Sequence, residues 1–313
     1  MSIRSENTLI LGLGLIGGSL ARALREAGFS RRISACGHRE ASLRRGRALG
    51  IIDDYTLDLD RALDSADLVV IATPTLIAEQ MLTRILPRYY SRQKQNTADI
   101  PVITDVASVK GNLQRAARQV CGAMPPQLVL GHPIAGSEQS GVEAARADLF
   151  VKHRVILTPV PENDAAAVGL IRDMWCSAGA EVVDMAVDEH DAVLAATSHL
   201  PHMLAYSLVD ALAQSERSED IFRFAAGGFR DFTRIASSDP VMWRDIAVAN
   251  RPALLAAIDS FAVHLNTLRA AIDSADTDGM LTTFSRAKAA RDEFSAMLEL
   301  RNTPDSRFGN TGE

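Results

Sequence analysis

Residues near the start of the chain have the types and spacing of a phosphate-binding loop. An aliphatic run leads into Gly12-x-Gly14-x-x-Gly17, and an amphipathic stretch follows directly. The first glycine permits a tight turn, the second lets the backbone approach a pyrophosphate, and the third allows close packing of helix on strand. The N–H groups that open the helix face the phosphates. The pattern predicts dinucleotide binding by Gly12, Gly14, Leu15, Ile16 and Gly17.

The end of the second expected strand indicates which dinucleotide is bound. In proteins that bind NAD, a carboxylate about 20 residues after the glycines usually holds the adenine ribose. Here that position is Gly37, and His38 and Arg39 follow. No carboxylate at this position repels a 2′-phosphate, and an arginine can bind one through two hydrogen bonds. The sequence therefore favours NADP and leaves NAD possible, with Arg39 as an ordinary solvated residue at a helix start as the alternative.

Polar residues also follow the next two expected strands. Ala72 and Thr73 close one apolar run, and Asp105-x-x-Ser108-x-Lys110 follows another. Ligands of open α/β sheets bind outside the carboxyl ends of the strands. We therefore expect Ala72, Thr73 and Ser108 beside the cofactor. Ser108 is also expected to be the N-cap of the following helix, which is compatible with a hydroxyl group near the nicotinamide.

A histidine with the properties of a general base follows a further strand, in the segment GHPIAGSE. His132 stands between a glycine and a proline, which predicts a loop at the carboxyl end of a strand rather than a helix or a central strand. An imidazole can take up a proton near neutral pH. His132 is therefore a candidate catalytic residue, and a structural turn is the alternative.

Two segments of the second half carry further candidates. His199 and His202 share roughly one helix face, but the sequence offers no further ligand near them, and we expect no metal site. Asp231 and Arg234 are three residues apart on an expected helix. They can form a surface ion pair, or the carboxylate can position the guanidinium to clamp an anionic substrate.

The elements that must position these residues change in type along the chain. Short apolar runs alternate with amphipathic stretches as far as about Val183, which predicts a doubly wound, mostly parallel sheet of the Rossmann type. From Asp188 onward apolar residues recur at helical spacing, and we expect an all-α domain whose first helix runs through His190 to about Ala213. The expected divisions are a dinucleotide-binding domain over 1–186, a helical substrate and dimerisation domain over 187–300, and a disordered tail over 301–313.

Composition excludes several classes of function. The 313 residues carry a net charge of -6 and only 5% aromatic residues, which argues against a nucleic-acid or anionic-membrane partner. The three cysteines form neither a disulfide framework nor a C-x-x-C pair. The first apolar run is too short for a signal peptide, and no later run approaches the roughly 18 residues of a membrane span. We expect a cytoplasmic protein.

Five segments, taken in order, resemble the prephenate/arogenate dehydrogenase family of tyrosine biosynthesis. They are GLGLIGGS, DVASVKG, GHPIAGSE, TSHLPH and GFRDFTRIASSDPVMW, and the resemblance extends from about Thr8 to about Leu298. The resemblance implies a homodimeric oxidoreductase. It would transfer a hydride from prephenate or arogenate to NAD(P) with loss of CO2, giving 4-hydroxyphenylpyruvate or tyrosine.

The resemblance also implies roles for particular residues. His132 matches the catalytic histidine that accepts the hydroxyl proton, and Ser108 matches a serine near that histidine and the nicotinamide. Arg234 matches the arginine that binds a substrate carboxylate. The other substrate-binding residues it implies are His202, Ser198, Glu138, Ser137 and Asp231.

Two other functions remain as alternatives at this stage. A β-hydroxyacid dehydrogenase has a similar first domain and a helical second domain. Such enzymes usually rely on a lysine in the helical domain, where this chain has almost none before Lys288. A non-catalytic NADP-binding module would need neither His132 nor Arg234, and Rossmann folds do host non-enzymes.

Overall fold

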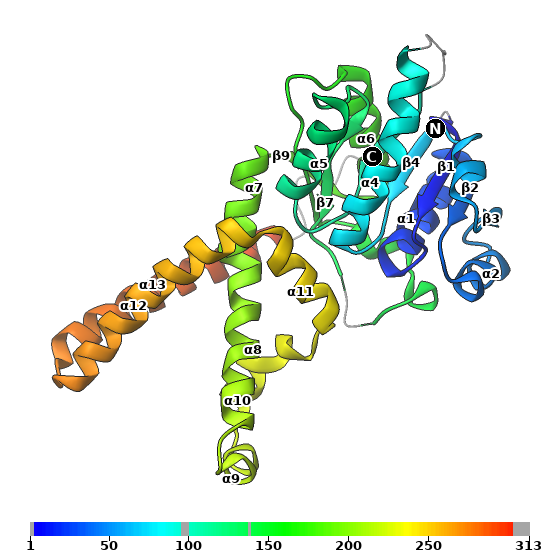
Figure 1. Ribbon diagram of the computed structural model, residues 1–313. Helices are drawn as coiled ribbons and strands as arrows, with labels where there is room; N and C mark the ends of the chain where they lie inside the picture. The colour runs from blue at the N-terminus through cyan, green and yellow to red at the C-terminus, as the bar shows by residue number, and fades with distance from the viewer. Residues whose placement is uncertain (1–2, 95–99, 137–138, 303–313) are drawn as a thin grey trace, which may run out of the picture. The chain divides into compact units, whose positions relative to one another are not determined.

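A computed structural model describes residues 3–94, 100–136 and 139–302 (Figure 1). Ser137 and Glu138 lie outside the described residues, as does almost all of the expected tail. The described chain forms two compact units, Met1–Leu255 and Ala256–Glu313. The boundary expected at 186/187 thus falls inside the first unit, and the assignment of domains on either side of it remains a prediction.

The first unit contains the expected doubly wound parallel sheet. Its six strands are all parallel and lie in the order β3-β2-β1-β4-β5-β6. They are β1 (Ser5–Leu11), β2 (Ser30–Cys36), β3 (Asp54–Thr56), β4 (Leu68–Ile71), β5 (Val102–Asp105) and β6 (Leu128–Val129). The order reverses between β1 and β4, and such a switch point is where ligands bind in open α/β sheets.

Helices cover this sheet on both faces, which explains why its most buried stretches are apolar, as in Leu9–Leu11 of β1 and the whole of β4. Two buried clusters result: one contains Leu20, Leu24 and Trp175, and the other contains Leu82, Leu86 and Leu113. The helices of this part are α1 (Leu15–Glu26), α2 (Glu40–Ala48), α3 (Leu59–Leu63), α4 (Thr75–Lys94), α5 (Gly111–Cys121) and α6 (Ala165–Ser177).

A second, three-stranded sheet differs from expectation. β7 (Gly131–Pro133) pairs antiparallel with β8 (Arg154–Leu157), which pairs parallel with β9 (Glu181–Asp184). The apolar runs at β8 and β9 were expected in the main sheet, and His132 was expected in a loop. His132 instead lies in β7, opposite Ile156. Pro133 is tolerated there because β7 is an edge strand, where a missing N–H leaves no partner unsatisfied.

The expected long helix after residue 187 is confirmed, with one interruption. α7 (Val187–Leu194) continues through a π-helical turn (Ala195–His199) into α8 (Leu200–Ala213) (Figure 1). Such turns insert one extra residue into a helix and are frequent at functional sites. Here the turn carries the TSH residues of the TSHLPH segment.

The remaining elements of the described chain are helical, as expected. They are α9 (Ser218–Arg223), α10 (Gly227–Thr233), a 3₁₀ turn (Arg234–Ser237), α11 (Pro240–Ala249), α12 (Arg251–Asp273) and α13 (Thr277–Asn302). Pro240 and Pro252 stand in the first turns of their helices, where a missing N–H costs nothing, whereas Pro201 directly follows the π-helical turn inside the continuous helix. Among the described residues no single helix is long and apolar enough to cross a membrane. Only α11 and α12 together reach that length and apolarity, across a bend of 94°.

Candidate active site

The glycine loop has the geometry of a phosphate cradle. Gly12 has φ +97°, and a Cβ atom there would lie 2.6 Å from the Ala72 carbonyl oxygen. A Cβ atom on Gly17 would lie 2.3 Å from the carbonyl oxygen of Gly12, so α1 packs directly on the turn. At Gly14 a Cβ atom would meet nothing within 4 Å. The first and third glycines therefore serve close packing, and the second leaves the approach to the backbone open.

The start of α1 is suited to an anion. Gly14 is its N-cap and provides no side-chain hydrogen bond, and the first turn contains no acidic residue. Its first N–H groups therefore have no capping side chain, and the helix dipole adds positive potential. A dinucleotide pyrophosphate fits both features. Gly14, Leu15 and Ile16 would hold it, beside Ala72 and Thr73 at the end of β4.

The residues expected at the adenine ribose lie at the end of β2. His38 and Arg39 are exposed, and the Nε–H of Arg39 donates to Nε2 of His38 at 3.2 Å. Arg39 is the N-cap of α2 without a capping side-chain bond. Two exposed basic side chains thus stand where the sequence predicts a 2′-phosphate, next to the half-buried Gly37.

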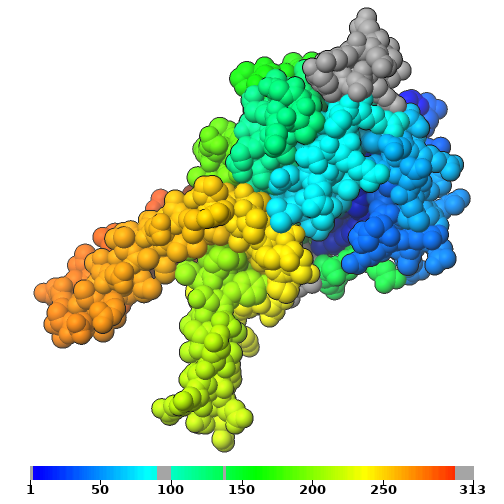
Figure 2. Space-filling model, in the orientation of Figure 1, coloured from blue at the N-terminus to red at the C-terminus, as the bar shows by residue number. Residues whose placement is uncertain are grey.

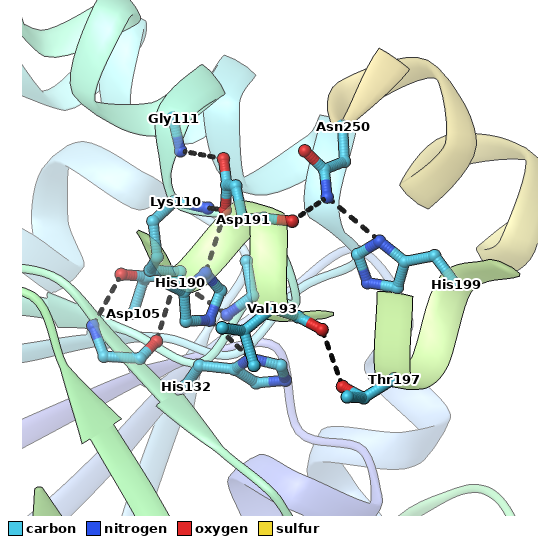
Figure 3. A network of polar contacts seen from close by, with 12 residues as sticks. Asp105, Lys110, Gly111, His132, His190, Asp191, Val193, Thr197, His199 and Asn250 are labelled. Atoms are coloured by element: carbon cyan, nitrogen blue, oxygen red, sulfur yellow. Dashed lines mark hydrogen bonds and ion pairs between the residues drawn. The ribbon is translucent and has the colours of Figure 1, made fainter. Parts of the chain in front are cut away.

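The prediction that Ser108 caps the next helix is wrong. α5 begins at Gly111 with Lys110 as its N-cap, and no side chain of the N-cap closes it. The carboxylate of Asp191 on α7 does so instead, accepting the backbone N–H of Lys110 at 2.9 Å and of Gly111 at 2.8 Å (Figure 3). Ser108 is half-buried in the turn between β5 and α5.

A buried ion pair holds the residue next to His132. Lys110 and Asp105 are both fully buried and contact each other, and Nζ of Lys110 also donates to the Gly131 carbonyl oxygen at 2.6 Å. The carboxylate of Asp105 accepts the N–H of Gly131 at 3.2 Å. Burial lowers the pKa of Lys110, while Asp105 opposes the shift. Both backbone groups of Gly131 are thereby fixed, and with them the start of β7.

His132 is the last of three side chains that are linked by hydrogen bonds (Figure 3). Its Nδ1 lies 2.9 Å from Nε2 of His190, and Nδ1 of His190 lies 2.8 Å from the Asp191 carboxylate. Burial lowers the pKa of His132 well below 6.5, and the nearby charges of His190, Lys110 and His199 lower it further. His132 is only 8% exposed. It is therefore a neutral imidazole at neutral pH, the form that can accept a proton.

Asn250, at the junction of α11 and α12, connects Asp191 of this network to His199. Its side-chain amide donates to the Asp191 carbonyl oxygen at 2.8 Å and lies 3.1 Å from Nδ1 of His199. Burial lowers the pKa of His199 to about 4. His199 is thus a neutral, hydrogen-bonded packing residue. Among the described residues no cluster of three or more histidine, cysteine or acidic residues could hold a metal ion.

One residue expected to bind substrate, His202, packs on Trp243 of α11. The ring of His202 stacks on the indole with centroids 3.5 Å apart, and its Nδ1 lies 2.9 Å from the Ser198 carbonyl oxygen. Burial lowers the pKa of His202, and the charge of Arg234 adds to the shift. His199 also contacts Trp243, with centroids 6.1 Å apart. The indole thus contacts both His199 of the buried network and His202.

Arg234 and Asp231 differ in their surroundings. Arg234 is exposed at the first position of the 3₁₀ turn, close enough to His202 to affect its pKa. The carboxylate of Asp231 pairs with Arg230 at 3.3 Å, and both of those side chains are mostly exposed. Such an exposed pair contributes about 0–1 kcal/mol to stability. Ser198 is half-buried in the π-helical turn.

Sequence reasoning missed three residues of this site. His190, Asp191 and Asn250 were not candidates, although they form the network behind His132. The only local signal is a histidine next to an aspartate at the start of a helix. That pair becomes informative only once the fold brings it to His132, 58 residues away in sequence.

The sheet order, the open glycine loop and the buried histidine beyond β6 define a nicotinamide-dependent oxidoreductase. Comparison with known proteins identifies the family. Residues 20–184 match the nucleotide-binding domain of prephenate dehydrogenase, and residues 186–286 match its dimerization domain. The chain belongs to the prephenate dehydrogenase family, and the resemblance carried by the five segments is confirmed.

Individual proteins of this family are similar to the chain over most of its length. A cyclohexadienyl dehydrogenase of Zymomonas mobilis is 37% identical over 289 residues, which cover 91% of this chain and 95% of that protein. A crystal structure of prephenate dehydrogenase from A. aeolicus, in complex with hydroxyphenyl propionate and NAD+, has a TM-score of 0.82 at 35% identity and covers 94% of this chain and 100% of that one. An arogenate dehydrogenase of Synechocystis has a TM-score of 0.76 at 26% identity, with 92% and 99% covered.

Proposed function

We propose that this chain oxidatively decarboxylates prephenate, arogenate or both, with NADP or NAD as the hydride acceptor. The observation that carries the proposal is the neutral, buried His132 beside the nucleotide-binding sheet. When bound, the nicotinamide accepts a hydride from the ring carbon that bears the 4-hydroxyl group. Loss of the ring carboxylate as CO2 makes the ring aromatic, so the chain has mainly to orient the substrate and remove one proton.

His132 removes that proton in the proposed mechanism. Its free ring nitrogen accepts the proton of the 4-hydroxyl group as the C–O bond gains carbonyl character. The Lys110–Asp105 pair holds Gly131, and the histidine therefore stays fixed while its charge changes. Ser108, in the turn after β5, would orient the nicotinamide.

The helical segments would bind the anionic side of the substrate. We assign a substrate carboxylate to Arg234, whose charge is felt at His202. His202 is fixed by its stacking on Trp243, and Ser198 lies one helical turn before it. Asp231 is assigned to the ionic surroundings of Arg234. Ser137 and Glu138 keep the substrate-binding roles implied by the family resemblance and lie outside the described residues.

Steady-state kinetics test the proposed function. The purified chain is given prephenate or arogenate with NADP or NAD, and formation of the reduced nicotinamide is followed by absorbance. We expect turnover of at least one of the two substrates and release of one CO2 for each reduced nicotinamide. A 3-hydroxyacid such as 3-hydroxyisobutyrate serves as the control for the β-hydroxyacid alternative. Turnover of the 3-hydroxyacid alone, or of none of these compounds, would contradict the proposal.

Cofactor preference follows from the end of β2. We expect a higher kcat/KM with NADP than with NAD, because Arg39 can bind a 2′-phosphate and Gly37 leaves no carboxylate to repel it. Loss of a charged hydrogen bond costs about 1.5–3 kcal/mol, so Arg39→Ala should lower kcat/KM for NADP roughly 10- to 100-fold and leave NAD almost unchanged. Gly37→Asp should shift preference in the same direction.

The control for this prediction is Arg47→Ala, which removes an exposed arginine from the last turn of the same helix. It should leave the ratio of the two kcat/KM values as in the wild type. Wild-type kinetics that favour NAD tenfold or more would contradict the assignment of Arg39.

We also propose a homodimer formed through the helical residues. The second unit, of which the orange segment is seen in Figure 2, carries large apolar side chains that are mostly exposed in the single chain, a pattern typical of an interface. They include Val263, Leu265, Ile272, Leu281 and Phe284. The match of residues 186–286 to a dimerization domain supports the same assignment.

Sedimentation velocity tests the homodimer. Two chains of 33.8 kDa give the expected species. The double substitution Val263→Asp and Leu281→Asp places two charges among apolar groups and should shift the equilibrium to the monomer. A wild-type chain that sediments as a monomer at micromolar concentration would contradict the proposal.

A further inference from the structure

We infer that His190 and Asp191 are positioning residues that hold His132 in the tautomer with its lone pair on Nε2. The inference rests on the proposed function, in which His132 is the general base. It goes further because it specifies which nitrogen accepts the proton and which residues decide this.

Asp191 is an anion that can only accept hydrogen bonds. Its two carboxylate oxygens accept the backbone N–H groups of Lys110 and Gly111 at the start of α5. Burial alone would raise the pKa of Asp191, but the hydrogen bonds from His190, Lys110 and Gly111 outweigh it and lower the pKa. The positive end of the α5 dipole favours the same charge. The proton between Asp191 and His190 therefore belongs to Nδ1 of His190.

The proton on Nδ1 of His190 determines where the ring proton of His132 lies. Burial lowers the pKa of His190, and the charge of Lys110 adds to this, while Asp191 and Asp105 oppose it. A neutral His190 has a single ring proton, which is already on Nδ1, so its Nε2 can only accept. The 2.9 Å contact with His132 then requires that Nδ1 of His132 donates. Since His132 is neutral as well, its lone pair lies on Nε2.

The same chain stabilises the protonated base. When Nε2 of His132 takes the substrate proton, the hydroxyl O–H bond breaks, an N–H bond forms and the ring gains one positive charge. The charged ring still donates from Nδ1 to His190, whose own Nδ1–H points to the Asp191 anion (Figure 3). The charges of His190, Lys110 and His199 each lower the pKa of His132 and so disfavour the imidazolium. Asp191, reached through His190, is thus a favourable partner for the imidazolium.

His190 and Asp191 are held by contacts with several elements, which suits a positioning role. Asp191 joins α7 to the start of α5, and its carbonyl oxygen accepts from Asn250 at 2.8 Å. His190 is fully buried. A base that must accept a proton from a fixed direction needs such support, because an imidazole that can rotate or exchange tautomers presents its lone pair only part of the time.

The competing explanation is that Asp191 only caps α5, with His190 as a packing residue. Variants of His190 separate the two, because they leave both backbone hydrogen bonds to Asp191 in place. His190→Leu keeps bulk but accepts no hydrogen bond from His132. His190→Gln can place an amide oxygen near the former Nε2 position and can still accept it.

We expect His190→Leu to lower kcat roughly 100-fold, because loss of the group that hydrogen-bonds a functional histidine typically lowers activity by one to two orders of magnitude. The KM of the substrate and the Kd of the cofactor should change less than threefold, and His190→Gln should recover kcat to within about tenfold of the wild type. His153→Leu, which removes an exposed histidine before β8, should behave as the wild type. Circular dichroism melting checks that each variant is folded.

A second measurement reads the tautomer without any turnover. The 15N shifts of the histidine rings in the wild type, assigned through the loss of signals in His132→Asn, should show a protonated Nδ1 and an unprotonated Nε2 for His132 at pH 7.5. In His190→Leu the two forms should become mixed. A protonated Nε2 in the wild type overturns the inference, and so does a folded His190→Leu with near-wild-type kcat. Should no substrate be turned over, the proposed function fails, and the ring shifts still decide the tautomer.

Discussion

Replacement of His132 by asparagine is expected to lower kcat about 10²–10⁴-fold with a much smaller change in KM. Asparagine has approximately the size and hydrogen-bonding capacity of the imidazole but cannot take up the hydroxyl proton. The measurement is steady-state kinetics with the better of the two substrates, together with a titration of the cofactor. A folded variant that binds NADP and retains near-wild-type kcat would remove His132 from the mechanism and make His202 the next candidate.

The pH profile provides an independent part of this prediction. The wild-type log(kcat/KM) should fall on the acid side, because the imidazolium form of His132 is no longer a base. Since burial lowers the pKa of His132, this limb should lie below the ordinary value of 6.5. The limb should be absent from any residual activity of His132→Asn. His199→Asn is the control, since His199 is a packing residue, and it should not reproduce the loss of kcat.

Truncation of Arg234 should have the second large effect. A charge-assisted contact to a substrate carboxylate costs about 2–4 kcal/mol when one partner is removed. Arg234→Ala should therefore raise KM for the substrate roughly 30- to 700-fold, at 1.4 kcal/mol for each factor of ten. The Kd of the cofactor should stay nearly unchanged, because Arg234 lies beside His202 and far along the chain from the glycine loop.

Arg230→Ala is the matched control for Arg234. Arg230 is an exposed arginine on the neighbouring helix and pairs with Asp231 at the surface. Its loss should change KM only slightly. If fluorescence titration shows that Arg234→Ala loses the cofactor as well as the substrate, Arg234 is a structural residue and not a substrate clamp.

The sequence contained enough information to predict the parts of the fold that depend on local pattern. The glycine loop, the apolar runs of β1, β2, β4 and β5, and the helix from residue 187 were all expected within a few residues of their observed bounds. Each depends on the spacing of neighbouring residues. Runs at β8 and β9 were recognised as strands but assigned to the wrong sheet, because a short buried run has the same composition in either sheet.

Ser108 and His132 show why contacts distant in sequence could not be predicted. Serine is a preferred N-cap, and the local rule therefore chose Ser108. The actual cap comes from Asp191, whose side chain arrives 81 residues later than Lys110. The loop predicted for His132 is wrong for a related reason. Pro133 excludes a central strand but allows an edge strand, and only the fold shows that β7 is one.

The contact between Asp191 and the start of α5 also bears on how the enzyme is made. During synthesis the N-terminal part of a protein emerges and folds first. The residues of the six-stranded sheet, the glycine loop and His132 all leave the ribosome before residues 190 and 191. At that stage α5 lacks its cap and His132 lacks its hydrogen-bonded neighbour. His132 therefore gains its hydrogen-bonded neighbour, and α5 its cap, only after α7 has been synthesised.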